Sequence, residues 1–326
     1  MDNNQSVAVL LATYNGEKYL AEQLESILYQ RDIEPHIIIR DDGSSDQTLA
    51  IVDTYVSRYP NQITIIKKET ASNGHLANFS ALCEYALATP FQFFCFADQD
   101  DVWHETKVKC LLTRLAEAQS NIDTPVLVHS DLCVVDENLN LINSSFVQYQ
   151  GLPDPATHDF PLFCHQNVVT GCATLFNRAL LEIATPLPDK VIVHDYWFAL
   201  NAKVFGKLIF EGKSLVNYRQ HNVNSIGATA LSTQRSFMST YIYKMAYRYI
   251  KLFPSYIRQC IQITKHQNYT RNSNFYIDEF AILHEQSLIK RLNSIPLYFP
   301  NADTLAMKIY LAILMITLPL LMDEKC

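Results

Sequence analysis

The sequence predicts an α/β fold in which a mostly parallel central sheet is flanked by helices and followed by a C-terminal helical extension. Short apolar segments alternate with segments of helical periodicity through residues 6–119, as in consecutive βαβ units. The apolar segments are unbroken, which is typical of inner parallel strands covered on both faces. Beyond Leu231 the alternation stops, and the chain becomes helical, Tyr-rich and basic.

The first part of the chain is expected to contain four strand–helix pairs. The strands are residues 6–14, 36–40, 63–67 and 93–97. The helices are residues 17–28, 47–59, 76–87 and 104–119. Turn-forming or capping residues mark the junctions, with Asn15-Gly16 after the first strand and Ser45 or Asp46 before the second helix. Right-handed crossovers then bring the ends of these strands to one edge, where phosphates and bases bind.

The second part is expected to complete the sheet. Further strands are predicted at residues 125–129 and 171–176, with a hairpin at residues 133–142 and a strand pair at residues 207–212 and 214–221. A helix follows Asn177-Arg178, and the polar junction in VIVHDYWFALNAKVFG (residues 191–206) runs into another helix. We expect one domain over residues 1–230 and a helical, basic and aromatic region over residues 231–326.

The composition is that of an ordinary globular protein. Of 326 residues, 48% are hydrophobic and 18% charged, enough for a large core. The net charge of −7 is uneven, because residues 231–326 hold 11 Lys and Arg against 6 Asp and Glu, whereas residues 1–230 hold 15 against 27. An acidic chain is a poor candidate for nucleic-acid binding, so we expect no nucleic acid among its partners. The basic C-terminal region suits an anionic membrane surface.

The cysteines and the N-terminus indicate the compartment. The eight cysteines form no CxxC pair, and we expect reduced thiols in place of a disulfide framework or a zinc site. The N-terminal segment MDNNQSVAVLLATYN has an acid where an export signal needs basic residues, so we expect no export signal. A cytoplasmic location follows, peripheral on the inner face of the cell membrane if the C-terminal region binds lipid.

The strongest chemical signal is FQFFCFADQDDVW, residues 91–103, where an apolar strand delivers Asp98, Asp100 and Asp101 to the ligand-binding edge of the sheet. Strand alternation predicts that Asp98 and Asp100 point to one side and Asp101 to the other, so that the first pair shares a cation. This spacing suits Mg²⁺ or Mn²⁺, which complete their coordination with phosphate and water. An acidic loop is the alternative, as is an N-cap role for Asp101 at the helix that begins near His104.

Six motifs follow one another along the chain: ATYNG, DDGSSDQT, ADQDD, GCATLFNR, HDYW and RQHNVN. In this order they resemble family 2 glycosyltransferases, which have the Rossmann-like GT-A fold, over roughly residues 6–228. HDYWFAL with YRQHNVNSIG is similar to the rhamnosyltransferase-like group that builds bacterial surface polysaccharides. The resemblance implies inverting, metal-dependent transfer of a sugar from a nucleotide diphosphate donor to a saccharide acceptor, lipid-linked in this setting. It favours rhamnose from dTDP-rhamnose, with UDP-glucose, UDP-galactose and UDP-N-acetyl sugars left open.

The resemblance also assigns the donor site. It implies that the pyrimidine, the ribose and the diphosphate are held by Thr13, Tyr14, Asn15, Glu17, Asp41, Asp42, Asp98 and Arg219. Within this set Asp98 would contact the ribose, and Arg219 is a plausible partner of phosphate. Asp100 would ligate the metal, with His221 completing its shell. The alternatives are a plain turn at Asp42-Gly43, a surface salt bridge for Arg219 and a structural role for His221.

Asp195 in HDYW lies where this family carries its catalytic carboxylate, and one such base suits single displacement with inversion. An N-cap for the helix from Tyr196 is the alternative. The acceptor side is assigned to His194, Tyr196, Trp197, Gly171 and Cys172. His194 could instead fill the junction, and Trp197 could pack in the core. The Gln-x-x-Arg-Trp motif of processive family members is not present, which favours transfer of single sugars.

The C-terminal segment Ile309 to Met322 is apolar but has 14 residues, whereas a membrane-spanning helix needs about 20. We expect it to lie in a membrane interface, with a helix that packs in an oligomer or in the core as the alternative.

Other classes fit less well. A nucleotidyltransferase needs a Gly-rich basic loop after the first strand, and ATYNGEKYL offers one Gly and one Lys. An NAD-dependent oxidoreductase needs GxGxxG, which follows no strand. A non-catalytic saccharide-binding scaffold would not need the acids at 98, 100 and 195.

Overall fold

The computed structural model describes residues 6–67, 74–119, 121–221, 252–271, 274–299 and 305–323. The chain forms two compact units. Unit 1 comprises Met1–Ala156, Val169–Leu187 and Val193–Ala228. Unit 2 comprises Thr157–Val168, Pro188–Ile192 and Thr229–Cys326, so two short segments from the middle of the chain belong with the C-terminal region.

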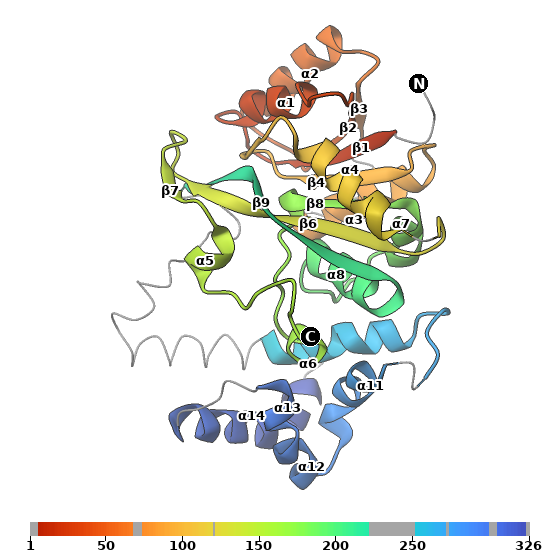
Figure 1. The fold of residues 1–326 in the computed structure, drawn as a ribbon, viewed down its shortest axis with the longest axis vertical. Helices are drawn as coiled ribbons and strands as arrows, with labels where there is room; N and C mark the ends of the chain where they lie inside the picture. The colour runs from red at the N-terminus through yellow and green to blue at the C-terminus, as the bar shows by residue number, and fades with distance from the viewer. Residues whose placement is uncertain are drawn as a thin grey trace. The chain divides into compact units, whose positions relative to one another are not determined.

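In unit 1 the described strands form one sheet in the order β3-β2-β1-β4-β8-β6-β9-β5, with β7 beside β6 (Figure 1). The strands are β1 (Val7–Thr13), β2 (His36–Asp41), β3 (Ile63–Ile66), β4 (Phe93–Ala97), β5 (Val102–Trp103), β6 (Val126–Val135), β7 (Leu141–Asn143), β8 (Thr174–Asn177) and β9 (Lys207–Arg219). Strands β3, β2, β1 and β4 are mutually parallel, and β6 and β9 form a second parallel pair. Antiparallel β8 joins the two groups. The predicted α/β class is confirmed.

Helices cover both faces of this sheet because its strands carry apolar residues on both sides. The helices of unit 1 are α1 (Leu20–Leu28), α2 (Thr48–Arg58), α3 (His75–Leu87), α4 (Lys107–Ala118), α5 (Phe146–Gln150), α7 (Arg178–Ala184) and α8 (His194–Phe205), with a 3-10 turn, η2, at Gly171–Ala173. Residues of α1, α2 and α4 form one buried cluster with alternate strand residues, among them Val9, Ile39 and Val128. Each fully buried aliphatic side chain of this kind stabilises the fold by about 1.5–3 kcal/mol relative to an exposed one.

The opposite face is largely aromatic. Phe96 of β4 meets Phe79 of α3 edge-on at 5.3 Å between ring centroids, and Phe198 of α8 at 5.0 Å. Phe176 of β8 lies 4.8 Å from the Phe96 ring. These contacts tie α3 and α8 to the strand that precedes the acidic motif, so the first turns of both helices lie close to its carboxyl end.

Two strand predictions are wrong in part. The predicted strand at residues 171–176 begins only at Thr174, because η2 occupies the first three positions. The Thr174 hydroxyl donates to the carbonyl of Gly171 at 2.7 Å, and the Ala173 N–H donates to the carbonyl of Thr170 at 3.0 Å. These local bonds close a tight turn where apolar composition suggested an extended chain.

The predicted strand pair at residues 207–212 and 214–221 is one continuous strand, β9. Both parts pair in parallel with β6, which also continues past the predicted residue 129 to Val135. Register shifts on either side of Asp131 accommodate the length of the two strands. The predicted hairpin is present as β6 and β7, which pair in antiparallel orientation.

Unit 2 is helical in its described residues. Its elements are α6 (Phe160–Phe163), α11 (Phe275–Ala281), η3 (Leu283–Glu285), α12 (Leu288–Asn293), α13 (Ile295–Tyr298) and α14 (Leu305–Asp323), together with helical residues 252–264. Rings of Phe253, Phe280 and Tyr298 form its core. Among the helices that the structure describes, none is long and apolar enough to cross a membrane.

Glycines at two places in unit 1 allow a direct test of the packing between β9 and β6. A Cβ at Gly206, just before β9, would lie 1.9 Å from the carbonyl oxygen of Pro125, whereas a Cβ at Gly212 within β9 meets nothing nearer than Phe210 at 4.0 Å. We predict that Gly206→Ala lowers the free energy of unfolding by about 1–3 kcal/mol, because backbone atoms must move apart. The matched control Gly212→Ala should change it by less than about 0.5 kcal/mol. Urea denaturation of both variants measures the difference, and equal midpoints would show that this junction is not tightly packed.

Candidate active site

The chemically distinctive side chains of unit 1 gather where the strands β1, β2 and β4 end. Asp41 ends β2, and the loops after β2 and β4 supply Asp42, Asp98 and Asp100. The first turns of α3 and α8 supply His75 and Asp195, and His221 lies two residues after β9. Parallel β1, β2 and β4 place these loops at one sheet edge, as the βαβ pattern predicts.

The loop after β2 is organised by Asp41. Its carboxylate accepts from the Thr13 hydroxyl at 2.8 Å, from the N–H of Gly43 at 2.9 Å and from the N–H of Ser44 at 2.7 Å. The sequence offered a turn as the alternative role for Asp42, but the carboxylate that holds this turn is that of Asp41. Asp42 instead accepts from the N–H of Gly74 at 2.6 Å, which links β2 to the start of α3.

The loop after β1 is held against the start of α2. The side chain of Asn15 accepts from the N–H of Ser45, and that of Glu17 accepts from the N–H of Gln47, both at 2.8 Å. Tyr14 leaves 56% of its surface exposed. Among these predicted donor-site residues, Asn15 and Glu17 fix the loop, whereas the ring of Tyr14 is open to a ligand.

The acidic motif takes a different shape from the predicted one. Ligand atoms of Asp98, Asp101 and Cys172 lie within 4.8 Å of one another, so the prediction that Asp101 points away from Asp98 is wrong. The strand ends at Ala97, and period-two alternation does not continue into the loop. The N-cap alternative for Asp101 is also wrong, because α4 begins at Lys107 with Thr106 as its N-cap.

Asp100 and His221 form the closest acid–imidazole pair at this edge, with His221 Nε2 and Asp100 Oδ2 2.8 Å apart. Burial raises the pKa of Asp100, and the nearby charge of Asp98 raises it further, while His221 opposes both. Two neighbouring carboxylates with an imidazole are a fitting donor set for Mg²⁺ or Mn²⁺. The trio of Asp98, Asp101 and Cys172 fits less well, since burial raises the pKa of the Cys172 thiol and a neutral thiol is a poor ligand for a hard cation.

Arg219 holds the acidic loop from behind and is 2% exposed. Its guanidinium donates to the carbonyl of Asp100 at 2.8 Å, to the carbonyl of Glu137 at 2.7 Å and to the carboxylate of Glu22 at 2.5 Å. The backbone N–H of Arg219 donates to the carboxylate of Asp101 at 3.2 Å. The salt bridge between Arg219 and Glu22 is thus buried on the arginine side, whereas the sequence offered a surface salt bridge as the alternative. A phosphate contact for Arg219 stays a prediction.

Asp195 lies in the first turn of α8 and accepts from the N–H of Gly171 at 2.9 Å. Burial raises the pKa of Asp195 to about 6, against the opposing effects of His75 and of the Gly171 N–H. The N-cap of α8 is Val193, so the capping alternative for Asp195 is wrong. A carboxylate whose pKa lies near neutrality is suited to accept a proton.

The other predicted acceptor residues are packed more deeply. Tyr196 and Trp197 are 1% and 3% exposed, and the Trp197 indole donates to the carbonyl of Ala184 at 2.7 Å. These rings pack in the core, in agreement with the alternative for Trp197. The ring of His194 stacks on Phe79 at 3.7 Å between centroids, and a Cβ at Gly171 would lie 2.8 Å from His194 Nε2. Position 171 therefore has no room for a side chain.

Sequence reasoning missed three residues at this edge. His75 is the first residue of α3. The rule that ligands bind at the carboxyl edge of the sheet, which located Asp98, could also have indicated His75. Gln99, within the acidic motif, exchanges two hydrogen bonds with the backbone of Tyr14, at 2.8 and 2.9 Å. Lys107 is fully buried, donates to the carbonyl of Cys172 at 2.7 Å and lies over the Trp103 ring, although only its place on an apolar helix face could have indicated this.

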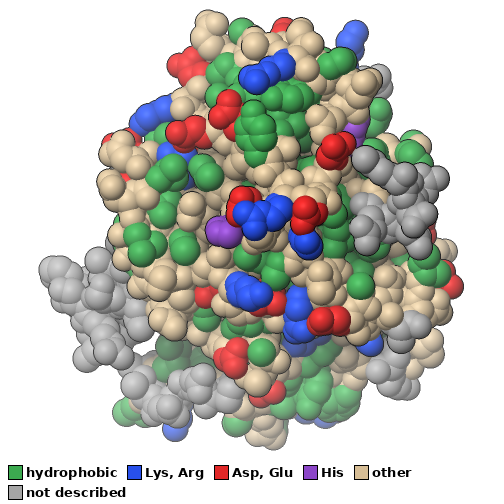
Figure 2. Space-filling model, turned by 45° about the horizontal axis from the view of Figure 1, so that its top comes forward, with side chains coloured by type: hydrophobic (Ala, Val, Ile, Leu, Met, Phe, Trp, Pro, Cys, Tyr) green, Lys and Arg blue, Asp and Glu red, His purple; other side chains and the backbone are tan. Residues whose placement is uncertain are grey.

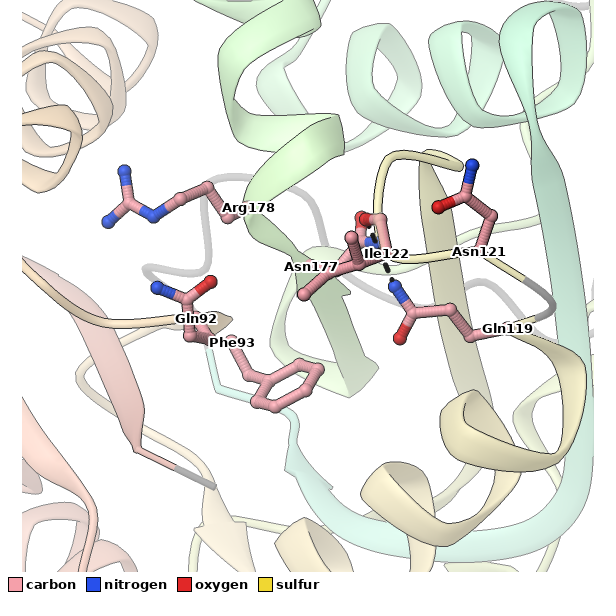
Figure 3. A pocket seen from close by; sticks show the side chains of 7 residues that line it. All are labelled: Gln92, Phe93, Gln119, Asn121, Ile122, Asn177 and Arg178. Carbon is pink, nitrogen blue, oxygen red and sulfur yellow. Dashed lines mark hydrogen bonds between the residues drawn. The ribbon is translucent and has the colours of Figure 1, made fainter. Parts of the chain in front are cut away.

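A cavity of about 260 Å³ lies away from this edge, at the amino end of β4 (Figure 3). Its lining residues are Gln92, Phe93, Gln119, Asn121, Ile122, Asn177 and Arg178. Arg178 is bonded to the carbonyls of Phe91 and Thr89, and Gln119 donates to the carbonyl of Ile122 at 3.2 Å. These polar groups are engaged within the protein, and the described residues that line the cavity include no acid and no imidazole.

On the face shown in Figure 2, acidic and basic side chains are interspersed and do not form a patch of one sign. In unit 1, Lys18 and Glu137 form an exposed ion pair at 2.7 Å. The seven cysteines in the described part of the chain are not joined in disulfides.

Solved structures share the fold. S. aureus TarS 1–349 in complex with UDP superposes with a TM-score of 0.57 at 15% identity, covering 96% of this chain and 90% of that one. The mannosyltransferase PcManGT from Pyrobaculum calidifontis, in complex with GDP-Man and Mn²⁺, gives a TM-score of 0.52 at 15% identity, with 98% and 88% covered. At these identities the similarity establishes the GT-A fold alone.

Sequence relatives point the same way. The dTDP-rhamnosyl transferase RfbG of Shigella flexneri is 28% identical over 233 residues, which are 67% of this chain and 74% of the relative. The amylovoran biosynthesis glycosyltransferase AmsB of Erwinia amylovora is 25% identical over 230 residues, 68% and 72% of the two chains. Residues 8–183, more than half of the chain, match the family described as glycosyl transferase family 2. The motif-based recognition is confirmed: the chain belongs to glycosyl transferase family 2 and is a glycosyltransferase.

Proposed function

We propose that the protein is an inverting, metal-dependent glycosyltransferase that moves rhamnose from dTDP-rhamnose to a hydroxyl of a saccharide acceptor during the synthesis of a surface polysaccharide. The observation that carries this proposal is the convergence of Asp98, Asp100 and His221 with the carboxylate of Asp195 at one edge of the sheet. The first group suits a cation and a diphosphate, and Asp195 suits a base.

The cation site is assigned to Asp100 and His221, with Asp98 beside them. A divalent cation bound there would neutralise the charge that develops on the departing nucleoside diphosphate. The loop of Thr13, Tyr14 and Asn15, with Asp41 and Asp42, would hold the pyrimidine and the ribose. In this arrangement Asp41 acts mainly by keeping the loop in shape, because its carboxylate already accepts from the loop.

Asp195 is assigned the role of base. As the acceptor oxygen attacks the anomeric carbon, the bond from that carbon to the diphosphate oxygen breaks, and the hydroxyl proton passes to Asp195. A single displacement inverts the anomeric configuration. The Gly171 N–H keeps one carboxylate oxygen in place, and Gly171 lacks a side chain that would push His194 against its neighbour.

The donor assignment is supported by the similarity to a dTDP-rhamnosyl transferase. A UDP-hexose or a UDP-N-acetylhexosamine is the alternative, since solved structures of the same fold hold UDP and UDP-GlcNAc. The chemistry is the same for either donor, so the choice between them is left to experiment.

We predict that nucleoside diphosphate is released from dTDP-rhamnose in the presence of Mn²⁺, and that Asp100→Ala lowers this release about 100-fold or more, because the departing diphosphate loses its cation. The experiment compares dTDP-rhamnose, UDP-glucose, UDP-galactose and UDP-N-acetylglucosamine. Asp53→Ala, at an exposed position of α2, is the control and should release diphosphate at the wild-type rate. Release from a UDP sugar alone would replace the donor, and wild-type rates in Asp100→Ala would remove Asp100 from the cation site.

Asp195→Asn should keep donor affinity, because an amide oxygen can still accept from the Gly171 N–H, while transfer falls about 100-fold or more through loss of the base. The pKa of Asp195 near 6 predicts a further effect. Below that pH the carboxyl is protonated and cannot accept a proton, so kcat/KM should fall about tenfold per pH unit. Steady-state kinetics measured from about pH 4.5 to about pH 8, in steps of about half a pH unit, test both points. Activity of the variant within about tenfold of wild type would exclude Asp195 as the base.

A lipid-linked acceptor would bring the enzyme to an anionic membrane surface, and α14 is the segment assigned to that contact. On one side of α14 the buried residues are Leu311, Leu314, Met315 and Leu318. The exposed residues, between 48% and 71% exposed, are Ile309, Ile313, Ile316 and Leu320. A helix that is apolar on both sides and exposed on one suits an interface between water and lipid. Lys308 and Lys290 supply positive charge on α14 and on α12, which packs against it.

We predict that Ile313→Asp weakens binding to vesicles that contain phosphatidylserine about tenfold, because the charge must enter the lipid interface. Vesicle co-sedimentation measures the effect. Ile122→Asp changes an isoleucine of unit 1 that is 66% exposed, compared with 48% for Ile313, and should bind like wild type. Unchanged vesicle binding by Ile313→Asp would exclude α14 as the contact, and a shift in oligomer size would indicate that the helix packs against another copy.

A further inference from the structure

His75 stands out among the residues that the proposed function leaves without a role. It is the first residue of α3 and follows Gly74, whose φ of 104° is strained for any residue with a side chain. The Gly74 N–H donates to the Asp42 carboxylate at 2.6 Å. The start of α3, and with it His75, is therefore fixed to the end of β2.

A second anchor lies one turn further along α3. Asn78 accepts from the Arg40 guanidinium at 3.0 Å and donates to the carbonyl of Thr13 at 3.4 Å. The ring of Phe79 packs on Phe96 and His194. Strands β1, β2 and β4 thus all determine where the first turn of α3 lies, and the backbone that carries His75 is set before any ligand binds.

The imidazole of His75 faces the carboxylates of the site. Its Nε2 lies 3.5 Å from Oδ1 of Asp98, which is longer than a good hydrogen bond. Burial works against protonation, but the charges of Asp98, Asp195 and Asp100 more than offset it, so the pKa of His75 is raised. All three carboxylates are therefore within electrostatic reach of this one ring.

His75 is also accessible. Its side chain is 37% exposed and that of Asp98 is 32% exposed. The neighbouring ring of His194, 5.0 Å away between centroids, is 2% exposed and forms a wall behind it. A ligand that enters the site meets the pair of His75 and Asp98, a hydrogen-bond donor beside an acceptor.

We propose that His75 and Asp98 together bind hydroxyl groups of the sugar that is transferred. This inference rests on the proposed function. In the proposed function, the sugar of the donor would lie between Asp98, at the diphosphate side, and Asp195, at the reacting carbon. Neighbouring sugar hydroxyls each donate and accept, and an imidazole N–H beside a carboxylate satisfies both requirements. His75 would then help to select the sugar, and contribute little to binding of the nucleotide.

The test compares ligands with and without the sugar. Isothermal titration calorimetry with Mn²⁺ and without acceptor gives the affinities of dTDP and dTDP-rhamnose, and of UDP and UDP-glucose as the second pair. We expect His75→Ala to bind the diphosphates within about twofold of wild type, while the preferred nucleotide sugar binds about tenfold more weakly, the size expected for loss of one strong hydrogen bond. His104→Ala, an exposed histidine before α4, is the matched control.

A second substitution guards against misfolding. His75→Gln keeps an N–H donor and should recover part of the lost affinity, with a thermal midpoint close to that of wild type. A parallel loss for diphosphate and nucleotide sugar would overturn the proposal, because His75 would then serve the nucleotide. Unchanged affinity for both would overturn it as well. If the wild-type protein bound neither class of ligand, the proposed function itself would fail, and the sugar contact with it.

Discussion

The site depends on holding three carboxylates close together at the end of one strand. Asp98, Asp100 and Asp101 follow β4 within four residues, and each raises the cost of ionising the next. Side chains from distant parts of the chain pack against these carboxylates. The Arg219 guanidinium donates to the carbonyl of Asp100, the Arg219 backbone N–H donates to the Asp101 carboxylate, and His221 lies against Asp100. Lys107 is buried nearby, and burial lowers its pKa to about 8.

This arrangement separates a rigid part of the site from an open part. Asp101, Arg219 and Lys107 are buried, and they fix the loop and the turn at Gly171–Ala173. Asp98, His75 and Tyr14 keep exposed surface at the same edge. The buried basic groups compensate the charge of the buried acid within the protein itself. The exposed acids, in contrast, can replace their present partners with a cation and a donor. Asp195 belongs to the rigid part because it accepts a hydrogen bond from the Gly171 N–H. A catalytic base must be held in a fixed orientation toward the proton that it accepts.

The sequence predicted the parts of the structure that local pattern controls. The apolar segments identified the first four strands, and the end of the fourth strand located Asp98 and Asp100 at the carboxyl edge of the sheet. Asp195 and His221 came from resemblance, because neither has a local signal of its own. Prediction failed for three reasons. Period-two alternation ends with β4, which misplaced Asp101, and local bonds turned residues 171–173 away from a strand. Pairing of both halves of β9 with β6 made β9 one continuous strand. His75 was missed because its neighbours come from β4 and α8.

The central claim is that this edge of the sheet receives a nucleotide diphosphate and its cation. A crystal structure with dTDP and Mn²⁺, with anomalous scattering to locate the metal, tests it most directly. We expect the metal at Asp100 and His221, the diphosphate beside it and the base against the loop of Tyr14. Metal bound between Asp101 and Cys172, or a nucleotide in the cavity lined by Gln92 and Arg178, would contradict the account.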